Sequence, residues 1–392
     1  MRKLYYIGLE PNNRDYSLQL TDWNTSVFHR RGLDYVVVPG ESLPQVKTNV
    51  NGTVDDCHAR SFYAMSQMMN LARMMKNGEV YFDDILYFED MFMPGIECLP
   101  YIMYQVSGEY RPQIFFRVNN QSFDPDSYSH YTGMNEWMSH YEKMVDTFAN
   151  GFIASSEEMV ASMKSAGYKA PIYNVSGLPF SKEEVLNRVD NDIKPFNDRH
   201  MRVVFAGSWD SEKQPDFYMD FIEEWTKRFG NNVEFVLALC DDLKTNNMDL
   251  MERTFKLEDE NKLVVYENLD RTSFYHLLNN TRVLFNCSLQ DWTTTSVSEA
   301  DTLGCNVLFP AYRSFPEVFS NDHTRLYIPW SIEDAITKMH NVLQYPSDNM
   351  GKISTYNDET IDRIVNIFEG RGTEYLRIKS NYRSHARHGK YF

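Results

Sequence analysis

The segment SLQDWTTTSVSEADTLGCNVLFP, residues 288–310, decides the fold because it joins a polar loop, a helix and a buried strand in that order. The apolar run VLFNC at 283–287 is typical of a buried parallel strand, and residues 293–303 follow with helical spacing and hydroxyls in the first turn. Gly304 ends that helix, and residues 305–310 predict the next buried strand. This succession indicates part of a parallel α/β sheet.

The same segment sets two carboxylates, Asp291 and Glu299, eight residues apart across the start of the helix. Helix N-termini carry unpaired backbone N–H groups and partial positive charge, so we expect this first turn to bind a diphosphate. Glu299 would then accept hydrogen bonds from ribose hydroxyls, and Asp291 would face a sugar. Alternatively, Thr293 only caps the helix and Glu299 lies on a solvated face. The expected diphosphate ligands are Thr293, Thr294, Thr295 and Ser296.

A second polar turn follows a strand predicted at 203–208. Its sequence GSWDSEKQP, residues 207–215, leads into a helix, and Lys213 near the helix start can reach a diphosphate as a mobile point charge. Gly207 and Ser208 in this turn are also expected to bind the ligand that carries the diphosphate. The alternative for Lys213 is a solvated surface lysine.

Strands and helices alternate along the chain, which predicts two doubly wound units with parallel sheets. A proline turn at 177–182 and the polar stretch up to His200 separate them, so we place the linker there. The predicted fold is α/β, with Rossmann-like domains at 1–178 and 179–370 facing a central cleft, and a tail at 371–392. The predicted strands of the first unit are 4–8, 34–38, 85–88, 113–117, 151–154 and 171–175; those of the second are 203–208, 233–238, 263–266, 283–287 and 305–310. A Met-rich helix is predicted at 59–76, and its methionines are expected to pack in the core.

Length and composition fit two domains, since 392 residues with 42% hydrophobic content suffice for two cores. No apolar run approaches the roughly 20 residues of a membrane span, and the first residues lead straight into a strand, so we expect a cytoplasmic protein without a membrane partner. The five cysteines lack disulfide or metal-ligand spacing and predict free thiols, with Cys98, Cys287 and Cys305 in apolar surroundings. No metal site is predicted.

The net charge of −16 and the pI near 5.1 argue against a general nucleic-acid coat, because neutralising phosphates requires a basic field. Contacts between nucleic acid and a local group of basic residues are still possible under this charge. The tail at 371–392 interleaves basic and aromatic residues, which suits phosphates and bases, or is simply a solvated terminus. Arg111, Arg117 and His130 are either phosphate contacts or surface residues.

These motifs together resemble the retaining, nucleotide-sugar-dependent glycosyltransferases of the GT-B fold. That family usually has Glu-x7-Glu, where this chain has Asp291 and Glu299, and usually has an arginine where this chain has Ser208. The resemblance implies a donor domain at 179–370, an acceptor domain at 1–178, a UDP-sugar donor and no required cofactor. It also implies a second cation beside Lys213, for which Arg202, Arg271 or a main-chain donor are candidates.

Five further strings, taken in order, look like a group of glycosyltransferases of T-even-like bacteriophages: YIGLEP at 6–11, VNGT at 50–53, FMPGIE at 92–97, SGLPF at 176–180 and EKQP at 212–215. The resemblance implies transfer of glucose or arabinose to 5-hydroxymethylcytosine in double-stranded phage DNA, within the host cytoplasm, which protects that DNA from host nucleases. A retaining mechanism is implied as well.

Residues for the acceptor side are expected after the strands of the first unit. Glu10 and Asp90 each follow such a strand and would serve as the base if the reaction inverts; otherwise they cap loops. Many relatives have a histidine after one of these strands, whereas this chain has Asn119 and Asn120, so a histidine base is not supported there.

Two further classes stay open. One is a glycosyltransferase acting on a polysaccharide, lipid or protein, and the other is a nucleotide-sugar-binding protein without catalysis. No residue pattern specifies an oligomeric state.

Overall fold

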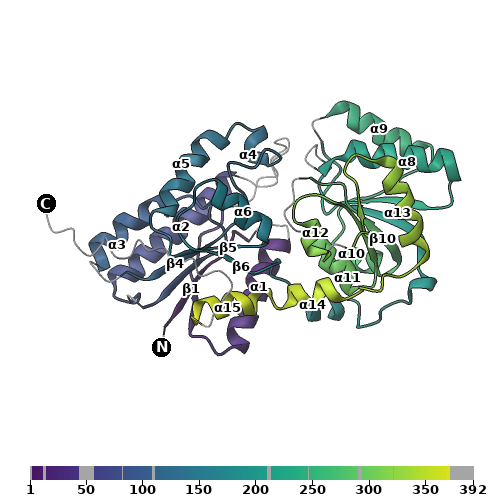
Figure 1. Ribbon diagram of the computed structural model, residues 1–392. Coiled ribbons are helices and arrows are strands. Elements are labelled where there is room, and N and C mark those ends of the chain that lie inside the picture. The colour runs from purple at the N-terminus through teal and green to yellow at the C-terminus, as the bar shows by residue number, and fades with distance from the viewer. Residues whose placement is uncertain are drawn as a thin grey trace. The chain divides into compact units, whose positions relative to one another are not determined.

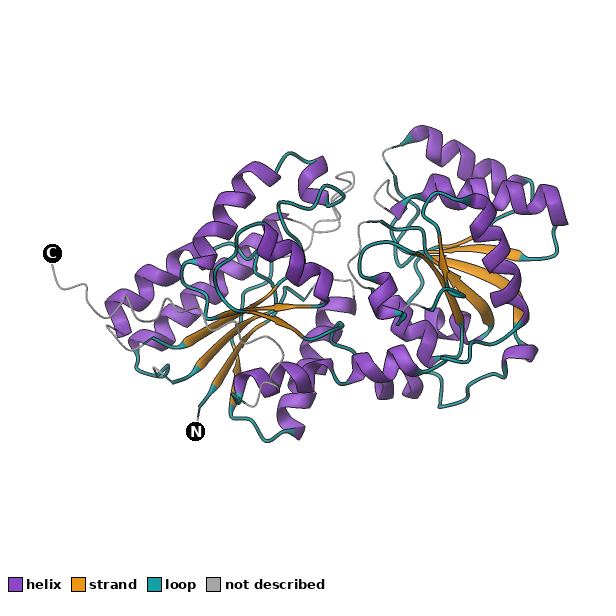
Figure 2. Cartoon of the chain, in the orientation of Figure 1, coloured by secondary structure: helices purple, strands orange, loops and turns teal. Residues whose placement is uncertain are grey.

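The computed structural model describes residues 2–11, 15–43, 57–81, 83–107, 111–209, 213–245, 247–289, 294–320 and 322–370. The described residues form two compact units, each with one parallel sheet between helices (Figures 1 and 2). Of the described residues, those up to 43, those of 57–175 and those of 362–370 belong to the first unit, and those of 176–361 belong to the second.

The sheet of the first unit has the six parallel strands that the sequence predicted, and the structure shows their order to be β2-β1-β3-β4-β5-β6. Each strand is a short apolar run, and the four residues of β1, β3 and β5 are all buried, as expected when helices cover both faces. The strands are β1 (Leu4–Ile7), β2 (Tyr35–Val37), β3 (Ile85–Phe88), β4 (Gln113–Arg117), β5 (Gly151–Ala154) and β6 (Ile172–Asn174).

Most helices of the first unit connect consecutive strands. The strand order reverses direction between β1 and β3, so right-handed crossovers put α1 on one face and the later connecting helices on the other. The helices are α1 (Asp15–Arg30), α2 (Cys57–Lys76), α3 (Leu99–Ser107), α4 (Tyr128–Tyr131), α5 (Asn135–Asp146) and α6 (Glu157–Ser165), with a 3-10 turn η1 (Ile96–Cys98). In the Met-rich helix α2, Met68 and Met75 are buried as predicted, but Met65 and Met69 are exposed.

The last helix in the described residues, α15 (Thr360–Phe368), returns the chain to the first unit. Asp362 accepts hydrogen bonds from Arg30 and Arg31 of α1 at 2.6 and 2.9 Å. The ring of Phe368 lies 5.1 Å from that of Tyr87 and 5.2 Å from that of Phe115, centroid to centroid. The sequence placed all of 179–370 in one domain; residues from Asp362 instead join the first unit, because their apolar side chains bury against its sheet.

Replacing Phe368 by alanine is expected to destabilise the first unit by about 3–5 kcal/mol, the usual cost of removing a buried aromatic ring. Urea unfolding followed by circular dichroism measures the change. The matched control is Phe255→Ala, because Phe255 is half exposed on α9 (Met248–Asp259) of the second unit. Equal effects of the two substitutions would contradict the packing of α15 against the first sheet.

The sheet of the second unit also has six parallel strands, in the order β12-β11-β10-β7-β8-β9. The chain runs outward from β7 to β9, returns across the sheet to β10, and then runs outward in the other direction. β7 and β10 are therefore neighbours at the point where the winding reverses, which is where open α/β sheets bind ligands. The strands are β7 (His200–Ala206), β8 (Glu234–Ala238), β9 (Val264–Tyr266), β10 (Thr281–Phe285), β11 (Asn306–Pro310) and β12 (Leu326–Tyr327).

An aromatic core holds the second sheet against α8. The rings of Tyr218 and Phe221 on this helix lie 5.8 and 4.8 Å from the ring of Phe285 on β10. The helices are α7 (Lys182–Asn187), α8 (Pro215–Phe229), α9, α10 (Arg271–Asn279), α11 (Thr295–Thr302), α12 (Phe315–Val318), α13 (Ile332–Gln344) and α14 (Lys352–Asp358), with a 3-10 turn η2 (Phe196–Asp198).

All five cysteines are free thiols. Cys287 and Cys305 are buried as predicted, but Cys98 is exposed, so its predicted apolar surroundings are wrong. None of the helices in the described ranges is long and apolar enough to cross a bilayer.

Candidate functional site

The turn after β7 brings its polar residues together at the carboxyl edge of the second sheet. Gly207 has a φ of +156°, and a Cβ atom there would lie 4.0 Å from Cγ of Lys213, so the lysine stem folds back over the turn. Trp209 is buried and donates a hydrogen bond to Thr254 of α9 at 2.9 Å, which anchors the turn. The hydroxyl of Ser208 is buried and has no hydrogen-bond partner among the described residues. Gly207, Ser208 and Lys213 are thus neighbours.

The N-terminus of α11 lies beyond β10, the strand next to β7. The helix begins at Thr295, and Thr294 at its N-cap makes no side-chain bond to the backbone of the first turn. Instead, the hydroxyls of Thr294 and Ser296 lie 2.9 Å apart. The side chain of Thr294 therefore leaves the first-turn N–H groups uncapped. Asp291 and Thr293 lie outside the described residues.

Glu299, one turn inside α11, is only 1% exposed. Its Oε1 accepts hydrogen bonds from Nη1 of Arg271 at 2.9 Å and from the hydroxyl of Tyr275 at 3.0 Å. Its Oε2 is buried and has no hydrogen-bond partner in the described part of the chain. The alternative that Glu299 lies on a solvated face is wrong. One oxygen of this buried carboxylate is hydrogen-bonded and the other has no partner among the described residues, so the second oxygen is suited to accept hydrogen bonds from a ligand.

Tyr275 escaped the sequence analysis, although its spacing of four residues from Arg271 places both on one helix face. Arg271, considered as a second diphosphate cation, instead pairs with Glu299. Arg202, the other candidate, pairs with Glu234 of β8 at 2.5 Å. No sequence pattern predicted a role for Arg313, whose Nε donates to the carbonyl of Leu289 in the β10–α11 loop at 3.3 Å. Arg313 therefore lies against the segment that leads into α11.

In the first unit, both acids expected after the strands are largely buried. Asp90 accepts hydrogen bonds at both oxygens, from the backbone N–H of Phe92 at 2.9 Å and from Arg60 at 2.6 Å. This geometry is that of the loop-capping alternative. Glu10 lies near Tyr63, and burial together with the charge of Glu10 raises the pKa of the Tyr63 hydroxyl.

Glu89 follows β3 and Arg117 ends β4, at the carboxyl edge of the first sheet, and the two side chains form a buried ion pair. Oε2 of Glu89 also accepts hydrogen bonds from Tyr6 at 3.1 Å and Asn24 at 3.3 Å, and Asn119 donates to the Glu89 carbonyl at 3.0 Å. Burial raises the pKa of Glu89, and the charge of Arg117 opposes that shift. Arg117 is 3% exposed, so its interpretation as a nucleic-acid phosphate contact is wrong.

Within the described residues, no group of three or more His, Cys, Asp or Glu side chains is placed to hold a metal ion.

Comparison with known proteins establishes the class of fold. Neither a protein-family model nor a curated protein sequence matches the chain. Solved structures do match, and they confirm the predicted fold class: α/β, with two parallel Rossmann-like sheets, as in GT-B glycosyltransferases.

Three of these structures show the range of the likeness. A sucrose-phosphate synthase from Thermosynechococcus elongatus has a TM-score of 0.62 at 10% identity, over 95% of this chain and 98% of that one. A UDP-forming α,α-trehalose-phosphate synthase from Burkholderia vietnamiensis has 0.61 at 11%, over 94% and 98%. A TarM variant from S. aureus, in complex with fondaparinux, α-GlcNAc-glycerol and UDP, has 0.51 at 13%, over 77% and 56%.

Proposed function

We propose that this protein is a glycosyltransferase that takes a sugar from a UDP-sugar bound at the carboxyl edge of the second sheet. The observation that carries the proposal is the buried carboxylate of Glu299. Arg271 and Tyr275 hold Oε1, so Oε2 has a fixed position and no partner among the described residues. A buried acceptor of this kind costs free energy unless a ligand satisfies it, and ribose hydroxyls are suitable donors.

The diphosphate would bind at the N-terminus of α11. The N–H groups of its first turn and the hydroxyls of Thr294, Thr295 and Ser296 would donate hydrogen bonds, and the helix dipole favours the negative charge. Lys213 from the neighbouring turn and Arg313 beside the β10–α11 loop would supply the positive charges.

These groups have a direct chemical task. Glycosyl transfer breaks the bond between the anomeric carbon and the diphosphate oxygen, so negative charge grows on the leaving group. Donors fixed around that oxygen lower the barrier because they need not reorganise during the reaction. We propose that Asp291 orients the sugar hydroxyls.

In the proposed retaining reaction, the acceptor hydroxyl attacks from the face that the diphosphate leaves, and a phosphate oxygen takes its proton. No pair of catalytic carboxylates is then needed, in contrast to most glycoside hydrolases. If the reaction inverts, Glu10 or Asp90 would serve as the base.

For the acceptor we propose 5-hydroxymethylcytosine in double-stranded phage DNA, with glucose or arabinose as the sugar. The support is the series of five sequence strings that resemble those of T-even-like phage enzymes. A sugar acceptor is the second candidate, because the similar structures are named as sucrose-phosphate and trehalose-phosphate synthases, and one from Burkholderia xenovorans holds glucose 6-phosphate.

The test incubates the protein with UDP-glucose or UDP-arabinose and three acceptors: a hydroxymethylated duplex, the same duplex with plain cytosine, and glucose 6-phosphate. Mass spectrometry of the products is expected to show transfer to the hydroxymethylated duplex alone. Transfer to glucose 6-phosphate alone would replace the DNA acceptor with the sugar acceptor. Failure to bind UDP in calorimetry, together with no transfer, would refute the glycosyltransferase proposal.

A further inference from the structure

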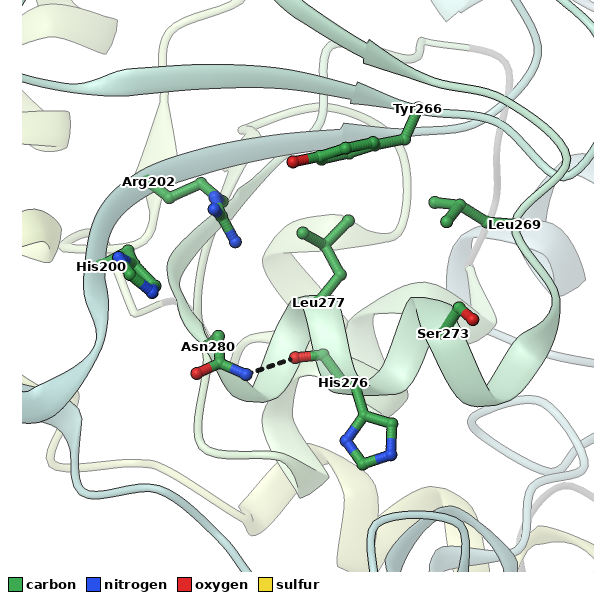
Figure 3. A pocket seen from close by; sticks show the side chains of 8 residues that line it. All are labelled: His200, Arg202, Tyr266, Leu269, Ser273, His276, Leu277 and Asn280. Carbon is green, nitrogen blue, oxygen red and sulfur yellow. Dashed lines mark hydrogen bonds between the residues drawn. The ribbon is translucent and has the colours of Figure 1, made fainter.

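The second unit contains a recess of about 380 Å³ between α10 and the strands β7 and β9 (Figure 3). It lies on the other side of α10 from Glu299. Arg271 and Tyr275 on α10 contact Glu299, whereas Ser273 and Leu277 on the same helix line the recess. The second pair follows the first by two residues along the helix. Two residues correspond to about 200° around a helix, so the two pairs are on opposite faces. The recess is therefore distinct from the proposed donor site.

Arg202 gives the recess its charge. Its side chain is only 12% exposed, and its Nε donates to Glu234 at 2.5 Å. Its terminal nitrogens make no hydrogen bond with any described residue, and Figure 3 shows the guanidinium directed into the recess. The N–H groups of the two terminal nitrogens form one planar fork, which matches the geometry of a phosphate.

Other groups around Arg202 also suit an anion. The ring of His200 and the hydroxyl of Tyr266 line the recess and have no side-chain partner among the described residues. Lys194 lies close by and donates to Asn280 at 2.9 Å. The nearby acids are engaged: Glu234 with Arg202, and Asp270 with the backbone N–H of Ser273 at 2.7 Å.

The opposite part of the recess is apolar. Figure 3 shows the ring of Tyr266 lying across the recess, with Leu277 of α10 directed toward it and Leu269 beside them. An aromatic ring and aliphatic side chains next to a cationic fork offer a flat ligand a stacking surface and its phosphate a partner. The volume is within the usual range of small-molecule sites, roughly 300–1,000 Å³.

We propose that this recess binds a nucleoside monophosphate, with the phosphate on Arg202 and the base against Tyr266. The site does not depend on the identity of the donor or the acceptor, because none of its lining residues belongs to the proposed donor site.

Calorimetric titration of the full chain with AMP and with UMP tests the proposal. Arg202→Gln is expected to weaken binding by about 10- to 100-fold, the range for losing charge-assisted hydrogen bonds to a phosphate. Tyr266→Leu is expected to weaken the binding of AMP more than the binding of inorganic phosphate, because only the base of AMP loses a stacking partner. Arg228→Gln and Tyr345→Leu are the matched controls, since both residues lie elsewhere on the second unit, and they should bind as the wild type does.

Glu299→Gln separates the recess from the proposed donor site. Binding that survives in Glu299→Gln and is lost in Arg202→Gln supports the recess. Binding lost in Glu299→Gln and kept in Arg202→Gln would assign the nucleotide to the edge near α11 and overturn the proposal. No binding of either nucleotide to the wild type would overturn it too.

Discussion

Lys213→Ala is expected to lower the rate of sugar transfer by about 10²- to 10³-fold, the usual effect of removing one group that stabilises developing negative charge. Lys213 folds over the Gly207 turn, next to the strand that leads to α11, and its ammonium can follow the departing diphosphate. Steady-state kinetics with UDP-glucose and a hydroxymethylated duplex measure the change. The loss should appear mainly in kcat, because the charge on the leaving group is greatest in the transition state.

The matched control for this prediction is Lys227→Ala, since Lys227 is an exposed lysine on the same helix that Lys213 precedes. It should leave transfer unchanged. Lys213→Arg is expected to recover part of the rate, because it restores the charge with another geometry. If Lys213→Ala retains full kcat, Lys213 is a solvated surface residue and the leaving group depends on other cations, Arg313 first.

Glu89→Ala is expected to destabilise the first unit by about 3–5 kcal/mol, because it leaves Arg117 buried without its counter-charge. The substitution also removes the acceptor for the Tyr6 and Asn24 side chains. Urea unfolding followed by circular dichroism measures the loss. Because the pair underlies the loops at the carboxyl edge of this sheet, we also expect weaker acceptor binding with unchanged affinity for UDP.

The double substitution Glu89→Leu with Arg117→Met provides the control. Replacing both charges with apolar groups removes the unpaired ion, so the double variant should be more stable than Glu89→Ala. Glu224→Ala, which breaks exposed ion pairs on α8, should have little effect. A double variant as unstable as Glu89→Ala would mean that packing, and not the unpaired charge, causes the loss.

The sheets could be predicted from sequence because each strand is a short apolar run bounded by polar turns. The same logic placed Lys213, Thr294 and Glu299 at one sheet edge, since the carboxyl ends of adjacent parallel strands meet there. The interactions that engage these groups could not be predicted. Whether Glu299 is solvated or buried depends on Arg271 and Tyr275 from another helix.

The misassigned residues share a cause. In the sequence, Arg117 is an isolated basic residue of the kind usually found on a surface. Only the structure shows that Glu89 lies beside it. Residues after Asp362 continue the helical pattern of the second unit, and no local signal shows that their apolar face packs on a sheet formed hundreds of residues earlier. Both cases depend on contacts between distant parts of the chain, which local periodicity does not encode.

The return of α15 has a consequence for synthesis on the ribosome. Tyr87 and Phe115 receive their cover from Phe368, which emerges after the entire second unit has been translated. We therefore expect the second unit to complete its fold first, although it is translated later. Until Phe368 is available, the aromatic surface around Tyr87 and Phe115 in the first unit would stay uncovered. A nascent chain arrested before residue 360 would present that surface to chaperones, and release of the last helix would end the exposure.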